Sequence, residues 1–338
     1  MRAALFAFTV KGKATALRIA AALDGWELSL RVPEKLKDVR FEAYAGTLPD
    51  YTGRVFERDA LIYVGAAGIA VRAIAPHVAS KRSDPAVLCV DEKGQYIIPI
   101  LSGHIGGANR LARSLAAALD ATPVITTATD VNGRFSVDTW ATEHNMVITS
   151  MPLAKRVSAE ILTRDIPFWS DAERSGKLVD GLIWSNAGSL GVCVSIRNLH
   201  PFEDTLLLIP KVLHVGLGCR RGTPAEAIDA AIEKVFNENY LRKEAVADAA
   251  SIDVKSDEVG LITCCRNYGW PVTFYTAEQL NAVPGDFAKS EFVKNTVGVD
   301  NVCERAAAAP GGRIIVRKTA LNGVTVAVAE EKWGIDFG

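Results

Sequence analysis

The stretch Leu101-Ser-Gly-His-Ile-Gly-Gly-Ala-Asn109 decides the fold of this chain, because the hydrophobic pattern changes its period across it. The apolar run 96–101 leads into the stretch and is typical of a strand. Beyond it, Leu111, Leu115 and Leu119 recur at the spacing of one helix face. The stretch is therefore predicted to be a glycine-rich turn that joins a strand to a helix.

This turn has the composition of an anion-binding site. Gly103, Gly106 and Gly107 allow the backbone to adopt positive φ and to approach a ligand closely. The start of the helix leaves N–H donors unpaired, and no carboxylate occurs from 93 to 119. His104 adds a group that exchanges protons near neutral pH. The alternative is a tight strand-to-helix turn in which the histidine only caps a neighbouring group.

The composition describes a soluble protein with more than one domain. A chain of 338 residues exceeds the size at which one core usually stops growing. Its net charge of −1, without a basic stripe, argues against a dedicated nucleic-acid binder. No apolar run approaches the roughly 20 residues that a membrane span needs. The six cysteines form no CxxC pair, so we expect a cytoplasmic protein with reduced thiols and no zinc or iron–sulfur site.

Strand and helix patterns alternate along the chain, which predicts mainly parallel sheets covered by helices on both faces. In the first part we expect strands at 2–9, 60–64 and 123–126, a helix at 13–23 and a hairpin at 86–101. The predicted fold class is α/β, with two three-layer α/β/α domains of mainly parallel sheets joined by a smaller middle region. The expected parts are an N-terminal domain at 1–130, a middle region at 131–210 and a C-terminal domain at 211–338.

A second glycine turn, Gly65-Ala-Ala-Gly-Ile-Ala-Val-Arg72, follows the buried strand 60–64. Gly65 and Gly68 open the turn, Arg72 lies in the helix after it, and no acid occurs from 65 to 83. Ligands of parallel α/β sheets collect at the carboxyl ends of the strands. We therefore expect both glycine turns to lie at that edge of the sheet.

Two charged residues follow the strand predicted at 123–126. Asp130 and Arg134 are expected to face the same cleft as the glycine turns. Helix capping and turn formation explain their positions equally well. The middle region, by contrast, carries no recognisable chemistry.

A third junction of strand, glycines and helix begins at Val212. Gly216, Gly218 and Gly222 approximate a dinucleotide-binding fingerprint, but the last spacing is wrong and no P-loop lysine is present. Arg220 and Arg221 fill the loop, and no acid occurs from 205 to 225, which favours binding of a carboxylate or phosphate. The alternative is a surface loop with solvated arginines.

The helix after this loop has a well-marked start. Thr223 is expected to be its N-cap, with Pro224 in the first helical position and Glu226 completing a capping box.

Several motifs together resemble one family. In chain order they are Gly65–Arg72, Leu101–Asn109, Gly216–Thr223, Ala250–Lys255 and Ser290–Arg305. With them the chain resembles the CbiG family, the cobalt-precorrin-5A hydrolases of anaerobic cobalamin synthesis. The resemblance covers nearly the whole chain, although 1–45 and 146–210 match only loosely. The C-terminal domain alone also resembles CobE, a separate protein of the aerobic route.

The resemblance implies a reaction and a substrate. Enzymes of this family open the δ-lactone on ring A of a cobalt corrinoid, release acetaldehyde and yield cobalt-precorrin 5B. It also implies no cofactor or resident metal of the chain's own, since the substrate carries the cobalt. The expected partner is this small polyanionic corrinoid, with transient handover to neighbouring pathway enzymes and no nucleic acid or membrane. Acid-free turns that carry arginines suit such a polyanion.

Within this reaction His104 is the expected general base, and Asp130 is the second choice, as base or as the group that orients His104. A nucleophilic Ser102 is less supported, because no G-x-S-x-G elbow surrounds it. The residues expected to bind the substrate are Gly65, Gly68, Arg72, Ser102, Gly103, Gly106, Gly107, Asn109, Arg134, Arg220, Arg221 and Thr223.

Two other functions stay open at the level of the sequence. The same turns would serve a non-catalytic tetrapyrrole-binding or handover module. A nucleotide-dependent enzyme is the third candidate, which the broken fingerprint disfavours.

Overall fold

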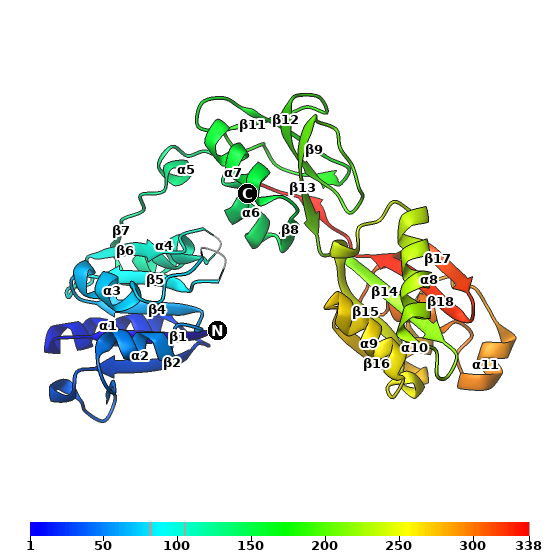
Figure 1. Ribbon diagram of the computed structural model, residues 1–338, viewed down its shortest axis with the longest axis horizontal. Helices are drawn as coiled ribbons and strands as arrows, with labels where there is room; N and C mark the ends of the chain where they lie inside the picture. The colour runs from blue at the N-terminus through cyan, green and yellow to red at the C-terminus, as the bar shows by residue number, and fades with distance from the viewer. Residues whose placement is uncertain (81–82, 105, 338) are drawn as a thin grey trace. The chain divides into compact units, whose positions relative to one another are not determined.

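The computed structural model describes residues 1–80, 83–104 and 106–337 (Figure 1). The chain forms two units, Met1–Trp140 and Ala141–Gly338, and each is described by itself. Ile105, in the middle of the central glycine turn, lies outside the described residues.

The first unit is built on a seven-stranded sheet of order β3-β2-β1-β4-β5-β6-β7. All neighbouring strands are parallel except the hairpin of β5 and β6. The strands are β1 (Arg2–Ala7), β2 (Glu27–Val32), β3 (Glu42–Ala43), β4 (Ala60–Val64), β5 (Ala86–Val90), β6 (Tyr96–Leu101) and β7 (Thr122–Pro123). The hairpin expected from the sequence is thus confirmed, whereas the strand expected at 123–126 is reduced to two residues that pair with β6.

Helices cover both faces of this sheet, because successive strand residues point to opposite sides. In β1, Leu5 packs with α1 (Val10–Ala22) and α4 (Ala108–Leu119) on one face. Its neighbour Phe6 packs with α2 (Leu48–Arg54) and α3 (Ala67–Ile74) on the other. Two short helices, α5 (Ala128–Val131) and α6 (Val137–Glu143), follow the sheet. The three-layer α/β/α arrangement predicted for this part is confirmed.

The second unit contains two five-stranded sheets. The first has the order β11-β9-β12-β13-β8 and is parallel except for β8. Its elements are β8 (Met146–Ile148), α7 (Met151–Glu160), β9 (Ile166–Ser170), β11 (Leu182–Trp184), β12 (Leu190–Val194) and β13 (Asp204–Pro210). A short strand β10 (Glu173–Arg174) pairs with β19 (Gly334–Ile335) near the end of the chain.

The second sheet of this unit has the order β16-β15-β14-β18-β17. Its strands are β14 (Leu213–Cys219), β15 (Val246–Ile252), β16 (Val272–Tyr275), β17 (Arg313–Leu321) and β18 (Val324–Glu330), and its helices are α8 (Ala225–Glu238), α9 (Val259–Tyr268), α10 (Ala277–Ala282), α11 (Glu291–Val297) and α12 (Val302–Ala308). Strands β14, β15 and β16 are parallel to one another, whereas β18 is antiparallel to both of its neighbours, β14 and β17. Asn322 and Gly323 connect that pair, both with positive φ, as a two-residue hairpin turn requires.

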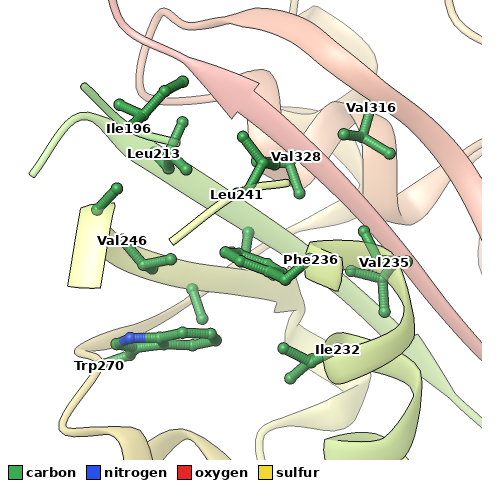
Figure 2. Packing of buried hydrophobic residues seen from close by; sticks show 14 of the residues in the cluster. Ile196, Leu213, Ile232, Val235, Phe236, Leu241, Val246, Trp270, Val316 and Val328 are labelled. Carbon is green, nitrogen blue, oxygen red and sulfur yellow. The ribbon is translucent and has the colours of Figure 1, made fainter. Parts of the chain in front are cut away.

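One apolar core joins the two sheets of the second unit. Figure 2 shows Ile232 and Phe236 of α8 against strand residues such as Leu213 and Val328. The same buried cluster includes Leu207 of β13 in the other sheet. This shared core explains why the parts expected at 131–210 and 211–338 form a single unit after Trp140. No helix among the described residues is long and apolar enough to cross a membrane.

Candidate active site

The central glycine turn lies at the end of β6, and its glycines are required by its own packing. Gly107 precedes α4 with a φ of 78°. A Cβ at Gly106 would lie 2.3 Å from the Cβ of Ser102, and one at Gly103 would lie 2.8 Å from Oδ1 of Asn109. Ser102 itself has a φ of 56° and donates its hydroxyl to the carbonyl of Asp84 at 2.9 Å. This contact gives no support to Ser102 as a nucleophile.

The two glycine turns of the first unit lie at opposite edges of the sheet, so the expectation of a shared edge is wrong. The hairpin reverses β6, which pairs its last residue, Leu101, with Val87 near the start of β5. The turn at Gly65 instead follows Val64, which pairs with Val90 at the far end of β5. Because β6 is antiparallel to β5, the turn after β6 cannot lie at the carboxyl ends of the parallel strands.

His104 lies between two carboxylates. Its Nε2 is 3.1 Å from Oδ2 of Asp130 in α5, and its Nδ1 is 3.1 Å from Oδ1 of Asp138 in α6. The His104 side chain is 18% exposed, so it is largely shielded but still reachable by a ligand. Ser136 donates its hydroxyl to Asp138 at 3.0 Å and lies 3.5 Å from Nδ1 of His104. Both nitrogens of this ring therefore face an acceptor.

A second set of contacts fixes Asp130. The buried amide of Asn109 donates to Oδ2 of Asp130 and to Oγ1 of Thr127, each at 3.0 Å. Arg113, one helical turn further along α4, forms an ion pair with Oδ1 of the same carboxylate. Asn109 is 4% exposed, so its amide serves this network; its predicted contact with the substrate gains no support from the structure.

The electrostatics favour the protonated imidazole. The hydrogen bond to Asp138 raises the pKa of His104, burial opposes this, and Asp130 raises it further. Burial alone would raise the pKa of Asp130, but Arg113 and His104 outweigh burial and lower it. The raised pKa and the acceptor at each ring nitrogen both favour an imidazolium between the two carboxylates. An imidazolium can donate a proton, whereas the sequence predicts a general base, and the catalytic role of His104 stays a prediction.

The carboxylates of this site come from outside the acid-free segment of the sequence. Asp130 was a candidate from the sequence, and it does contact His104. Asp138 and Arg113 were missed. Asp138 opens a helix and carries no motif of its own, and only the fold of 131–137 brings it to the ring. The spacing of Asn109 and Arg113, one helical turn apart, was the available signal for Arg113.

The remaining candidates of the first unit lie around the turns. Gly65 packs under Phe8, where a Cβ would meet the ring at 2.9 Å, and Gly68 has open space around it except for Arg72. Arg72 is exposed in α3, and no ion pair of it is found in the described part of the chain. Arg134 is half-buried between α5 and α6, and its N–H donates to the carbonyl of Thr129.

The second unit contains a cavity of about 580 Å³ at the carboxyl ends of β14 and β15. Its wall includes Arg220 and Arg221, which the sequence singled out, together with Lys255 and Lys318, which it did not. Apolar side chains complete the wall, namely Ile252, Val254, Val297 and Val302. No acidic residue of the described chain lines it.

Arg221 and Thr223 make contacts within the protein. Arg221 forms an ion pair with Asp257 and donates to the carbonyl of Val254. Thr223 donates its hydroxyl to the carbonyl of Arg220 at 2.7 Å and does not cap α8, whose N-cap is Pro224. The capping box predicted here is therefore wrong, because the threonine hydroxyl closes the preceding turn instead.

The glycines of the imperfect fingerprint serve packing. A Cβ at Gly216 would lie 1.8 Å from the carbonyl oxygen of Cys303, so α12 can approach β14 only over a glycine. The N–H of Gly222, a potential phosphate donor, already bonds the buried carboxylate of Glu258 at 3.0 Å. These contacts account for the pattern without a nucleotide. Among the described residues, no group of three or more His, Cys, Asp and Glu could hold a metal ion.

Comparisons with known proteins agree over most of the chain. Models of the families "Cobalamin synthesis G N-terminal" and "Cobalamin synthesis G C-terminus" match residues 51–130 and 213–329. A cobalt-precorrin-5A hydrolase of Salmonella typhimurium is 36% identical and is aligned over 96% of each chain. Another, of Priestia megaterium, is 32% identical over 87% of this chain and 84% of its own. Protein CobE of a Sinorhizobium species is 32% identical over 35% of this chain and 79% of its own.

An α/β fold with His104 held between two carboxylates is compatible with acid–base chemistry, and the names of the relatives place the chain among hydrolases. The similarity to the Salmonella relative extends over nearly the whole length of both proteins. The chain belongs to the CbiG family of cobalamin synthesis.

Proposed function

We propose that this chain hydrolyses the ring A δ-lactone of cobalt-precorrin 5A and releases acetaldehyde, which leaves cobalt-precorrin 5B. The observation that carries the proposal is the imidazole of His104 held between Asp130 and Asp138. Two relatives that align with most of this chain are named cobalt-precorrin-5A hydrolase. The substrate brings the cobalt, and the chain itself supplies binding and proton transfer.

The proposed sequence uses His104 twice. Water adds to the lactone carbonyl, and the protonated His104 gives its proton to the ring oxygen as the acyl–oxygen bond breaks. The two protons of the added water pass to solvent, so the products of this step are a carboxylate, a free hydroxyl and neutral His104. Neutral His104 then takes the hydroxyl proton while the adjacent carbon–carbon bond breaks, acetaldehyde leaves, and the macrocycle accepts the electron pair. The imidazolium between its two carboxylates is thereby restored.

The test is acetaldehyde release from cobalt-precorrin 5A by the purified chain and by His104→Gln. We expect the substitution to lower the rate by about 100-fold or more, since positioned proton transfer contributes on that order. His200→Gln, a change of an exposed histidine in the second unit, is the matched control and should retain full activity. Unchanged activity of His104→Gln would remove this residue from the mechanism. Absence of acetaldehyde with the unaltered chain would refute the reaction itself.

A further inference from the structure

We infer that the cavity at the carboxyl ends of β14 and β15 binds the carboxylate-bearing edge of an anion with an apolar body. The inference rests on the proposed function in one respect only, that the natural ligand is the corrinoid substrate. At about 580 Å³ the cavity has the size of a small-molecule site.

The charged side chains that line this cavity are all basic, although the chain as a whole has a net charge of −1. Arg220 and Lys318 line it, and neither pairs with a carboxylate of the described residues. Lys255, with a side chain that is 14% exposed, lies 3.2 Å from the carboxylate of Glu258. Two cations are thus left without an internal counter-ion in one wall. Arg220 is exposed and Lys318 is half-buried, so both can reach an anionic ligand in the cavity, which would supply the counter-ion that they lack.

The cavity also has an apolar wall, formed by Ile252, Val297 and Val302. Val254 at the same cavity is 45% exposed. Apolar side chains beside two unpaired cations fit a ligand whose hydrophobic ring carries acidic groups at its rim. A small hydrophilic anion would leave the valines without a partner.

The same wall disfavours a nucleotide. No aromatic side chain of the described residues lines the cavity, so a base would find no ring to stack on. The N–H of Gly222 is already bonded to Glu258, which removes a donor that a phosphate would use. Arg221 reaches Asp257 and the carbonyl of Val254, so it holds the neighbouring segment that carries Lys255. Arg220 and Lys318 are therefore the basic residues that we expect to contact the ligand.

The test measures binding of uroporphyrin, a tetrapyrrole fringed with acetate and propionate groups, to the full chain by fluorescence titration. Arg220→Gln and Lys318→Gln are each expected to weaken binding by about tenfold, because each removes one charge-assisted contact. The loss should shrink as salt concentration rises. Arg313→Gln and Lys332→Gln remove equal charges from exposed side chains of the same unit that do not line the cavity, and should bind like the unaltered chain.

The inference is overturned if Arg220→Gln and Lys318→Gln bind uroporphyrin as tightly as the unaltered chain, or if the control variants lose as much. His104→Gln keeps the two questions apart, because it should lower the rate of acetaldehyde release by about 100-fold or more and leave uroporphyrin binding intact. If the unaltered chain binds uroporphyrin through Arg220 and Lys318 but releases no acetaldehyde, the proposed function fails and the cavity assignment stands.

Discussion

At the scale of single residues, the protonation of His104 depends on the two carboxylates that flank its ring, each at 3.1 Å from a ring nitrogen. Asp138 provides the largest stabilisation of the imidazolium, and Asp130 adds to it. Asp130 is also shared with Arg113 and Asn109, so less of its charge is available to the ring. The two aspartates should therefore be distinguishable by experiment.

Asp138→Asn is expected to lower the pKa of His104, because it removes the charged acceptor on Nδ1. If the reaction begins with the imidazolium, the fall of kcat/KM on the alkaline side should then begin at a lower pH. The measurements are an NMR titration of the imidazole and a pH profile of acetaldehyde release. Asp130→Asn is the comparison, and it should lower the pKa of His104 by less. A larger decrease with Asp130→Asn would reverse this assignment.

The sequence predicted His104, Asp130 and Asn109 as members of one site because they belong to, or follow closely, a recognisable glycine turn. It could not predict Asp138, since a lone aspartate at the start of a short helix is common. Nor could it predict Lys318, which lies almost a hundred positions after Arg220 and reaches the same cavity only because β17 folds back beside β18.

At the scale of elements, the glycines differ in whether the packing of helices and strands requires them. Gly216 lies in β14 where α12 crosses it, and its hydrogen faces the carbonyl of Cys303. Gly68 lies near the start of α3, and an added Cβ would meet nothing closer than Arg72 at 3.6 Å. Gly216 is needed for packing, whereas Gly68 has room for a ligand or for a larger side chain.

Gly216→Ala is expected to destabilise the second unit by about 1–3 kcal/mol or more, as overpacking of a close contact does. Gly68→Ala should instead stabilise the first unit by about 0.5–1 kcal/mol, because alanine favours a helix and loses less backbone entropy on folding. Urea unfolding followed by circular dichroism measures both. A stable Gly216→Ala would contradict the packing argument. Lower activity in a stable Gly68→Ala would support the predicted role of Gly68 in substrate binding.

The element order was largely predictable, because alternating apolar patterns determine which segments become strands and helices. The direction of β6 shows the limit of that approach. The hairpin was correctly expected, but its consequence for the turn at Gly103 depends on which strands β6 pairs with, and pairing is a long-range property. Thr223 shows a second, local limit: its hydroxyl could accept from an N–H of the helix or donate to the carbonyl of Arg220, and it donates to Arg220.

At the scale of the whole molecule, a second histidine makes stability depend on pH. His214 in β14 is 2% exposed, with Nδ1 at 3.0 Å from Asp248 and Nε2 at 2.8 Å from Glu331. Burial alone would lower the pKa of His214, but the two carboxylates outweigh burial and raise it above 6.5. The buried ring thus ties β14 to β15 and to the segment after β18.

The stabilising contribution of His214 should be complete below its ordinary pKa near 6.5 and lost as pH rises through the higher pKa of the folded state. Unfolding of the second unit should accordingly become easier from mildly acidic to mildly alkaline pH. Denaturant unfolding at several pH values measures this, and His214→Gln should flatten the dependence. His200→Gln, at an exposed position, should leave it in place. An unchanged slope in His214→Gln would assign the pH dependence to other groups.

The location of Asp138 has a practical consequence for anyone who dissects this protein. The N-terminal family model stops at residue 130, whereas the first unit extends to Trp140. A fragment trimmed to the matched segment would keep His104 and Asp130 but discard the aspartate on the other side of the ring. Kinetics or titrations recorded on that fragment would describe an imidazole with a different proton affinity from the one that the intact polypeptide uses.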